Sequence, residues 1–289
     1  MAAEAPDQAR GSTDCGTFLL DCVGSFTEQQ LQVIASPQRR ETSPEIDAII
    51  ESTWLAELEC ARQAGRRLYD GQLFRLIDHT CHGQQLTLTV GPVSFKEFLG
   101  TNLTHAYLRY LHGPEVLGDV LGVSAAVRSR DGFLVLGRRS QRVAYHAGRI
   151  HPIGGVVESA GPDQPPPHPA RVMIRELTEE MNLAANDVET ILCLGLVRDK
   201  HIVQPELIFD VVAGADVSQL RRLRQKQHLT EEHTELLPVR DHPAAVVGFI
   251  EQNFRELTPV GLAALLLHGL HHWGSGWFAT TRGYLRSVI

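Results

Sequence analysis

The segment 175–180, with the sequence Arg-Glu-Leu-Thr-Glu-Glu, places three carboxylates at a spacing suited to metal chemistry. Residues three and four apart share one face of a helix, so Glu176, Glu179 and Glu180 can converge on one point. An apolar stripe at helical spacing can bury the opposite face, and it consists of Ala170, Ile174, Leu177 and Met181. Crowded carboxylates repel one another, so the pattern favours a hard divalent cation bound through oxygen, Mg²⁺ or Mn²⁺. A solvated acidic helix face is the alternative.

The surroundings of this segment resemble the Nudix hydrolase motif, G-x5-E-x7-R-E-U-x-E-E-x-G-U, in which U is a bulky aliphatic residue. Gly155 resembles the opening glycine, and 175–183 matches the second half except at Asn182, where the family has glycine. Asparagine is the usual substitute for glycine where a helix ends in the left-handed region. We therefore expect that conformation at Asn182.

The first half of the motif is interrupted by a proline-rich insertion at 161–167. Such a segment predicts a surface loop between the glycine turn and the helix. It leaves Asp163 as the nearest counterpart of the motif's first glutamate.

The composition limits the classes of molecule that the protein is expected to bind. A chain of 289 residues can hold one large domain or two smaller ones, and its net charge of −7 argues against a nucleic acid partner. Five widely spaced cysteines without a C-x-x-C pair indicate neither a disulfide framework nor a zinc site, and favour a cytoplasmic location. The segment 1–16 is polar and predicts a flexible tail, while the longest apolar run, 261–267, is too short to span a bilayer. No membrane partner is expected.

The chain divides near residue 115, and the region 17–115 predicts a small α+β unit. Its expected strands are 17–23, 72–78 and 85–90, and its expected helices are 27–34, 44–64 and 94–99. No catalytic constellation stands out in this region.

The region 116–289 predicts an α/β domain. Strands 122–128 and 133–138 flank Asp131-Gly132, which is a strong hairpin signal. The motif helix follows. The remaining expected strands are 189–197 and 207–213, and the remaining expected helices are 217–226, 243–256 and 259–271, the last with Thr258 as N-cap.

Taken in order, four segments give a closer resemblance, to the animal Nudix hydrolases that cleave UDP-glucose and UDP-galactose. These segments are 74–76, 98–102, 133–140 and 180–183, and the likeness extends from about residue 19 to about residue 267. The resemblance implies a Nudix α/β/α sandwich with a mixed sheet at 116–289, preceded by the smaller α+β region. It also implies a Mg²⁺-dependent pyrophosphatase that converts a UDP-sugar to UMP and a sugar 1-phosphate.

The same resemblance assigns roles near the motif. Glu176, Glu179 and Glu180 would hold the metal, with the backbone carbonyl of Gly155 as an additional ligand. A diphosphate resists nucleophilic attack because its oxygens are negative, so metal ions must neutralise them. Arg175 is expected to orient a neighbouring glutamate, since pairing with Glu179 four residues on is available. Glu176 could also take the proton from water.

Further contacts are expected from outside the motif. Glu206, at the start of a predicted strand, is the first candidate for an additional carboxylate, with Glu232 and Glu235 as alternatives that are more simply surface residues. Arginine suits phosphate because its planar fork donates two hydrogen bonds, and Arg139 is the preferred candidate for substrate binding. His268, His271 and His272 are better explained by capping or packing than by a metal site.

Two other functions stay open. The chain could cleave coenzyme A or another nucleoside diphosphate, because Arg139, Ser140, Arg142 and Gly148 partly resemble the extra motif of coenzyme A pyrophosphatases. It could also be a catalytically silent module that binds a nucleotide sugar. The oligomeric state is not indicated by the sequence.

Overall fold

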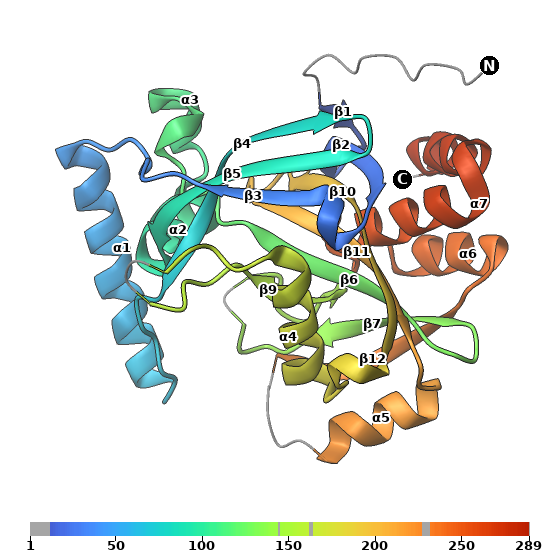
Figure 1. The fold of residues 1–289 in the computed structure, drawn as a ribbon. Coiled ribbons are helices and arrows are strands. Elements are labelled where there is room, and N and C mark those ends of the chain that lie inside the picture. Colours follow the sequence, from blue (N-terminus) through green and yellow to red (C-terminus); the bar gives the residue numbers. More distant parts are fainter. Residues whose placement is uncertain (1–11, 144, 162–163, 227–231, 289) are drawn as a thin grey trace.

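The computed structural model describes residues 12–143, 145–161, 164–226 and 232–288 (Figure 1). Most of the expected flexible tail at 1–16 lies outside these residues, and so does Asp163, but the described end of that segment is ordered, because Thr13–Asp14 form strand β1 and pair with Phe18–Phe26.

A mixed sheet forms the centre of the described structure. Only the pair β11 and β6 is parallel, and the other neighbouring strands run antiparallel. In the described residues the sheet has nine strands: in order, β1 (Thr13–Asp14), β2 (Phe18–Phe26), β10 (Val188–Asp199), β11 (Pro205–Ala213), β6 (Gly122–Arg128), β7 (Phe133–Arg139) and β12 (His233–Arg240), with β8 (Ile150–His151) beside β7 and β9 (Ile153–Val156) beside β6. β6 and β7 form the hairpin predicted from Asp131-Gly132, and the strands expected at 189–197 and 207–213 are confirmed as β10 and β11.

A second, smaller sheet has the order β3 (Leu31–Ala35), β5 (Gln85–Ser94) and β4 (Gln72–His82). The predicted hairpin of β4 and β5 is confirmed. The helix expected at 27–34 is wrong, because only Glu28–Gln30 form a 3-10 turn and the chain then enters β3. The Thr27 and Gln30 side chains make a capping box, but Leu31 is buried and β3 pairs in parallel with β5. Tertiary pairing thus overrides a local helix signal.

Helices cover both faces of the central sheet (Figure 1). The core on one face includes residues of α4 (Pro169–Met181) and α5 (Val217–Lys226), and the core on the other includes residues of α6 (Pro243–Asn253) and α7 (Pro259–Val288). The N-terminal region carries α1 (Pro44–Gln63), α2 (Phe95–Phe98) and α3 (Leu108–His112), with a π-helical turn at Leu99–Leu103 and a 3-10 turn at Pro114–Val116, and a further 3-10 turn at Ala185–Asp187 precedes β10. α7 continues beyond the predicted end at 271, across a kink at Gly274 whose φ is 87°. No helix in the described part of the chain is long and apolar enough to cross a membrane.

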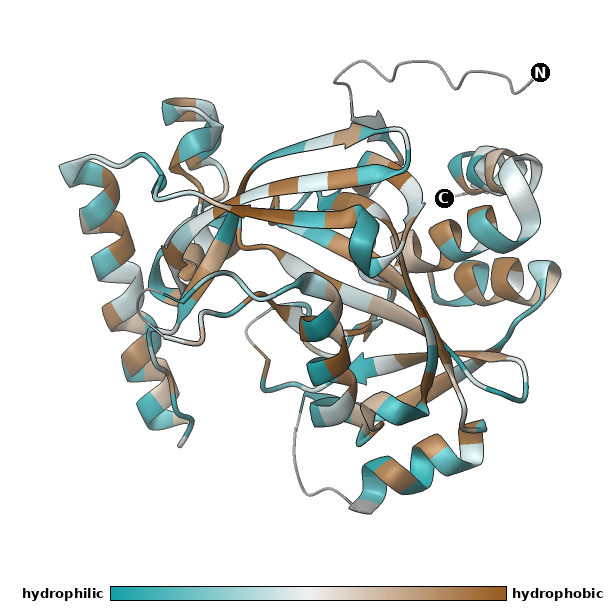
Figure 2. Cartoon of the chain, in the orientation of Figure 1, coloured by the Kyte–Doolittle hydropathy of each residue, from teal (hydrophilic) through white to brown (hydrophobic). Residues whose placement is uncertain are grey.

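Successive residues of β6 point to opposite faces of the sheet, and each face is buried in its own core. Val123, Ala125 and Val127 join the core beneath α4 and the small sheet, whereas Ala126 faces the core beneath α6 and α7. Burial on both faces explains why this strand, apart from Ser124 and Arg128, is apolar. Figure 2 shows α1, in contrast, with alternating apolar and polar bands, as expected for a helix that buries only one face.

The region 17–115 contributes directly to the central sheet. β2 pairs with β10 along its length, and apolar residues of β4 and β5, such as Phe74 and Leu88, belong to the same core as α4. The two regions expected on either side of residue 115 therefore share a sheet and a core.

A buried ion-pair network fixes α7 to the sheet. The Nδ1 of His268 lies 2.6 Å from Asp210 on β11, and its Nε2 lies 3.0 Å from Asp241, which also pairs with Arg128 at 2.7 Å. His272 lies 3.0 Å from the other oxygen of Asp210. Burial alone would lower the pKa of His268, but its hydrogen bonds to the two carboxylates raise it above the usual 6.5. His268 therefore acts through ion pairing, which is more specific than the capping or packing expected.

We expect His268→Gln to destabilise the fold by about 3 kcal/mol at pH 6, because Asp210 and Asp241 each lose one cationic partner in a largely buried network. Since the folded pKa of His268 is raised, its contribution is complete below pH 6.5 and is lost as the pH rises through the folded value. Urea unfolding at several pH values should show the difference between variant and wild type shrinking as the pH rises above 6.5 and through the raised folded pKa of His268. His82→Gln, at an exposed position, serves as the control. A difference independent of pH would contradict the ionic explanation.

Candidate active site

The motif helix α4 is held rigidly at both ends. The His168 side chain accepts a hydrogen bond from the backbone of Ala170, and Pro169 occupies the first helical position. Asn182 ends the helix with φ 55° and ψ 31°, which confirms the expected left-handed conformation. The apolar face of the helix is buried in the core and consists of Ala170, Val172, Met173, Leu177 and Met181, whereas Ile174 of the predicted stripe is only partly buried and lies outside this core. The acidic face is therefore presented in a fixed orientation.

Glu176 lies against the glycine strand β9. Its carboxylate accepts a hydrogen bond from Arg175 at 2.6 Å, and the residue is only 8% exposed. A Cβ at position 155 would lie 2.4 Å from the carboxyl carbon of Glu176, which is closer than real contacts allow. Gly155 is required because any side chain there would displace Glu176.

Glu180 is buried beside the same strand. One of its oxygens, Oε2, accepts a 3.3 Å hydrogen bond from the backbone of Gly154, while Oε1 has no hydrogen-bond donor among the described residues. Burial raises the pKa of Glu180 to about 8. His233 lies 3.4 Å away, but burial lowers its pKa to about 3, so it is neutral and does not balance a carboxylate. A buried oxygen without a donor is a position where a cation would be stabilising.

The three motif glutamates do not converge on one point as expected. Glu179 is exposed and lies 3.8 Å from the Nε of Arg175, whereas the closer partner of this arginine is Glu176. Arg175 thus separates the carboxylates and also lies 3.8 Å from Glu158. Among the described residues, the group of ligating side chains whose atoms all lie within 4.8 Å of one another is instead the network of Asp210, His268 and His272.

A cavity of about 220 Å³ adjoins Gly154 and Gly155, and it brings together residues that are distant in sequence. Glu206 and Glu232 both line it. Glu206 accepts a hydrogen bond from Ser124, and burial raises its pKa to about 7. Desolvation and the neighbouring Glu180 raise the pKa of Glu232 to about 7 as well.

The two alternatives to Glu206, which are Glu232 and Glu235, therefore lie in different places. Glu232 is exposed, as expected, and it also lines the cavity, whereas Glu235 is paired with Arg138 at 3.6 Å outside it.

Arg139 provides the cationic wall of this cavity. It is 7% exposed, its Nε donates to the carbonyl of Tyr145 at 3.2 Å, and its guanidinium lies 4.7 Å from the centre of the Tyr145 ring. The preceding Arg138 pairs with Glu256 at 2.7 Å and does not line the cavity. Alternation along β7 therefore separates two adjacent arginines into an inner and an outer one.

The cavity also includes residues from outside the motif. Leu73, Phe95 and Phe98 come from the N-terminal region, and His151 comes from β8. Burial keeps the pKa of His151 well below its usual value, so this histidine is neutral. Phe98 begins the segment 98–102 used for the family resemblance, but no sequence pattern placed it or the other side chains at the site, and Leu73, Phe95 and Phe98 reach it from β4 and α2.

Over 212 residues the chain is 32% identical to a curated protein of Homo sapiens, a similarity that covers 64% of this chain and 69% of that protein. This extent of similarity, together with the motif helix beside the glycine strand, shows that the chain belongs to the Nudix hydrolase family, whose members hydrolyse pyrophosphate bonds. The human protein is named Uridine diphosphate glucose pyrophosphatase NUDT22, and the protein of the same name from Mus musculus is 32% identical over 207 residues, or 62% of this chain and 66% of that protein.

A third relative of this name, from Bos taurus, is 34% identical over 181 residues, and the chain spans 61 to 69% of the length of the three relatives. No family model matches the sequence. Among solved structures, the Bacillus subtilis pyrophosphohydrolase BsRppH overlaps with 54% of this chain and 85% of its own, at 17% identity and a TM-score of 0.35. A Nudix family hydrolase from Clostridium perfringens overlaps with 54% of this chain and 100% of its own, at 12% identity and a TM-score of 0.33. Scores this low support no conclusion about the fold or the function.

Proposed function

We propose that the protein hydrolyses UDP-glucose or UDP-galactose to UMP and a sugar 1-phosphate with the help of Mg²⁺, or Mn²⁺ in its place. The names of the relatives support the substrate. The observation that carries the proposal is the buried Oε1 of Glu180, which has no hydrogen-bond donor in the described part of the chain and lies on the same helix face as Glu176. The five cysteines are free, and this supports a cytoplasmic location as part of the proposal.

The residues present fit a hard divalent cation. Carboxylate oxygens of Glu176, Glu179 and Glu180, with the carbonyl of Gly155, would supply the oxygen-only donors that Mg²⁺ prefers. The bound cation would neutralise the diphosphate and lower the pKa of the attacking water. To join them, Glu179 would change its side-chain rotamer and give up its 3.8 Å contact with Arg175, and its exposed position leaves room for this movement.

The remaining roles follow from the contacts of each side chain. Arg175 orients Glu176 through their 2.6 Å hydrogen bond. Glu176, whose pKa is raised by burial, can accept the proton of the attacking water. Arg139 binds a phosphate oxygen from the opposite wall of the cavity, and Glu206 supplies a further carboxylate facing the same space.

We expect Glu206→Gln to lower kcat/KM by about 10-fold to 100-fold, the usual cost of losing a residue that supports a metal site. The amide oxygen can keep the hydrogen bond from Ser124, so the fold should be preserved. Glu235→Gln is the matched control, because it makes the same chemical change outside the cavity. Steady-state kinetics of both variants make the comparison. Equal activity of the two would remove Glu206 from the site.

The substrate can be tested by phosphate release, with a coupled phosphatase, from UDP-glucose, UDP-galactose, ADP-ribose, coenzyme A and dinucleoside polyphosphates. Each compound is tested with and without Mg²⁺. Preferential Mg²⁺-dependent cleavage of the UDP-sugars is expected. A preference for coenzyme A would keep the Nudix chemistry but overturn the proposed substrate. Absence of turnover in folded protein would favour the silent binding module.

A further inference from the structure

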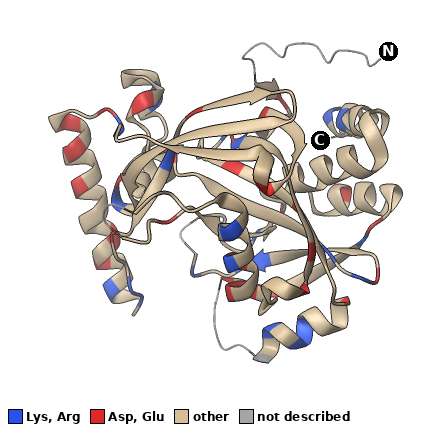
Figure 3. Cartoon of the chain, in the orientation of Figure 1, with Lys and Arg blue, Asp and Glu red and all other residues tan. Residues whose placement is uncertain are grey.

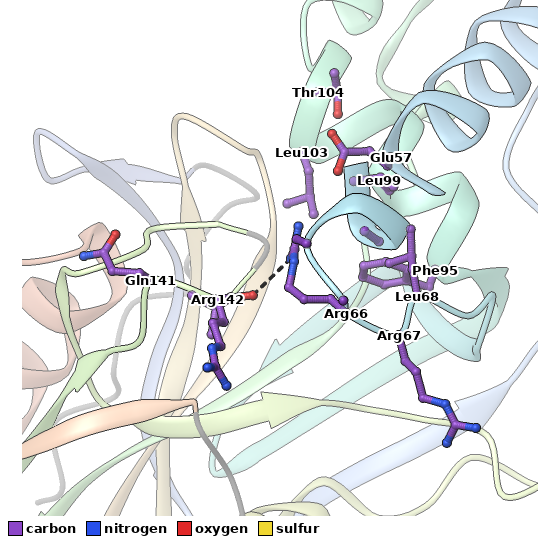
Figure 4. Close-up of a pocket in the computed structure, with 14 residues that line it drawn as sticks. Glu57, Arg66, Arg67, Leu68, Phe95, Leu99, Leu103, Thr104, Gln141 and Arg142 are labelled. Atoms are coloured by element: carbon purple, nitrogen blue, oxygen red, sulfur yellow. Dashed lines mark hydrogen bonds between the residues drawn. The ribbon is translucent and has the colours of Figure 1, made fainter. Parts of the chain in front are cut away.

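Two further hollows of the described structure differ in their relation to the candidate active site. The cavity in Figure 4, about 920 Å³, adjoins that site, because Phe95 and Val143 line both. A separate cleft of about 620 Å³ shares no described lining residue with either of them. Its walls come from residues 146–149, from the turn that follows β10, and from the segment that joins α6 to α7.

This separate cleft is lined by basic side chains, and no carboxylate is among its described lining residues. The basic side chains are His146, Arg149, Lys200, His201 and Arg255. Figure 3 shows acidic residues along much of α1, and the whole chain has a net charge of −7, so a cleft without a carboxylate is a local exception. Positive charges on a concave surface reinforce one another and attract anions.

Arg149 is half-buried in the wall of the cleft without a counterion. Its guanidinium donates hydrogen bonds to the carbonyl oxygens of Arg255 at 3.0 Å and Leu257 at 2.8 Å. These bonds fix the position of the group but do not neutralise its charge. Within the described part of the chain, neither Arg149 nor Arg255 forms an ion pair with a carboxylate. A bound anion would supply the missing negative charge.

The carboxylates nearest to the cleft are already engaged. Asp199 lies 3.0 Å from the Nε2 of His146 and accepts a 2.7 Å hydrogen bond from the backbone N–H of His201. Lys200 lies 2.9 Å from Asp14, and both side chains are exposed. An exposed pair of this kind contributes little free energy, so Lys200 can exchange Asp14 for a ligand.

The size and the floor of the cleft indicate an organic anion. A volume of about 620 Å³ falls within the range of roughly 300 to 1,000 Å³ typical of ligand pockets and is larger than inorganic phosphate requires. Phe254, Leu257 and Leu262 provide apolar surface for a carbon skeleton. A phosphate group offers three acceptor oxygens, which can meet cations from three separate segments of the chain.

We propose that this cleft is a second binding site, for a small phosphate ester, separate from the site of hydrolysis. The two sites are adjacent, because His146 lines the cleft while Tyr145 lines the active-site cavity. Thr258 of the cleft also lies 2.9 Å from the Nδ1 of His151, which lines that cavity. The sugar 1-phosphate of the proposed reaction and an unrelated phosphorylated metabolite share this chemistry, and the experiment below distinguishes them.

The test compares two double variants of the full chain. Lys200→Ala with Arg255→Ala removes two cations from the cleft, and Arg62→Ala with Arg222→Ala removes two from the surface outside it. All four side chains are exposed, so neither change should disturb the fold. Arg149 is retained, because it supports two backbone carbonyls. Calorimetry without Mg²⁺ measures the binding of glucose 1-phosphate, glycerol 3-phosphate and inorganic phosphate.

The cleft variant should lose about tenfold or more in its affinity for the phosphate esters, the cost of losing a hydrogen bond to a charged group. The surface variant should bind like the wild type. Hydrolysis of UDP-glucose should be unchanged in both, since none of the four side chains lines the active-site cavity. Preference for glucose 1-phosphate would identify the reaction product as the ligand, and equal or better binding of glycerol 3-phosphate would identify another ester. Both results support the site.

Equal affinity of the two double variants would place the esters elsewhere and overturn the inference. Absence of binding to the wild type at millimolar concentration would overturn it as well. A parallel loss of UDP-glucose hydrolysis in the cleft variant would make the cleft part of the substrate site, which also contradicts the inference. Wild-type protein that binds the ester through the cleft but cleaves no nucleotide sugar would refute the proposed function and retain this second site.

Discussion

Glu180→Gln is expected to lower Mg²⁺-dependent turnover by about 10³-fold or more, since it removes a charged oxygen ligand from the proposed metal site. The fold should be preserved. The buried Oε1 has no hydrogen-bond donor to lose among the described residues, and the amide oxygen of glutamine can still accept the hydrogen bond from Gly154. Steady-state kinetics with UDP-glucose, together with thermal unfolding without metal, would measure both effects.

The control for this variant is Glu189→Gln, an exposed carboxylate on β10 away from the site. Its turnover and its Tm should match those of the wild type. Near-normal turnover in Glu180→Gln would remove Glu180 from the proposed catalytic role. A large drop in Tm would mean that Glu180 supports the fold, and the kinetic loss could not then be assigned to chemistry.

Gly155→Ala should reduce kcat/KM by about 10²-fold to 10³-fold, because a misplacement of about 1 Å at a reacting centre has this order of effect. The new Cβ would lie 2.4 Å from the carboxyl carbon of Glu176, and the glutamate must move away to admit it. Since Glu176 is held by Arg175 at 2.6 Å, the displacement also disturbs the residue that orients it.

The matched control is Gly248→Ala in α6, where an added Cβ meets no atom within 4 Å. Alanine is the better helix former, so this control should be as stable as the wild type or slightly more stable. Kinetics of the two variants at saturating Mg²⁺ provide the comparison. If Gly155→Ala retains full activity, Glu176 is not held against the glycine strand during turnover, and the proposed geometry is wrong.

Several features of the fold could be predicted because their signals are local. The apolar stripe of α4, the Asp131-Gly132 turn and the left-handed Asn182 each depend on residues only a few positions apart. A local signal also led to a wrong prediction, the helix at 27–34. The capping box of Thr27 and Gln30 is present, but the following residues gain more by pairing with β5 than by continuing a helix.

The site was predictable only in part. Glu206 and Arg139 were selected by their place along the chain, and the structure brings both to one cavity. Glu232 looked like an ordinary surface residue, because its position in the cavity depends on how β12 pairs with β7. The separation of Glu176 from Glu179 by Arg175 depends on rotamers and on contacts with β9, which helical spacing alone does not specify.

The sequence by itself determined the chemistry of the motif helix and the family to which it belongs. Side-chain type and helical spacing fix which acidic groups share a face, and these properties are carried by a short segment. Only the tertiary structure decided that β2 joins the central sheet, that His268 pairs with Asp210 and Asp241, and that Phe95 borders the active site. These contacts join residues far apart in the chain. Their free energy comes from burial and strand pairing in the folded state, and a short sequence pattern does not predict either of these.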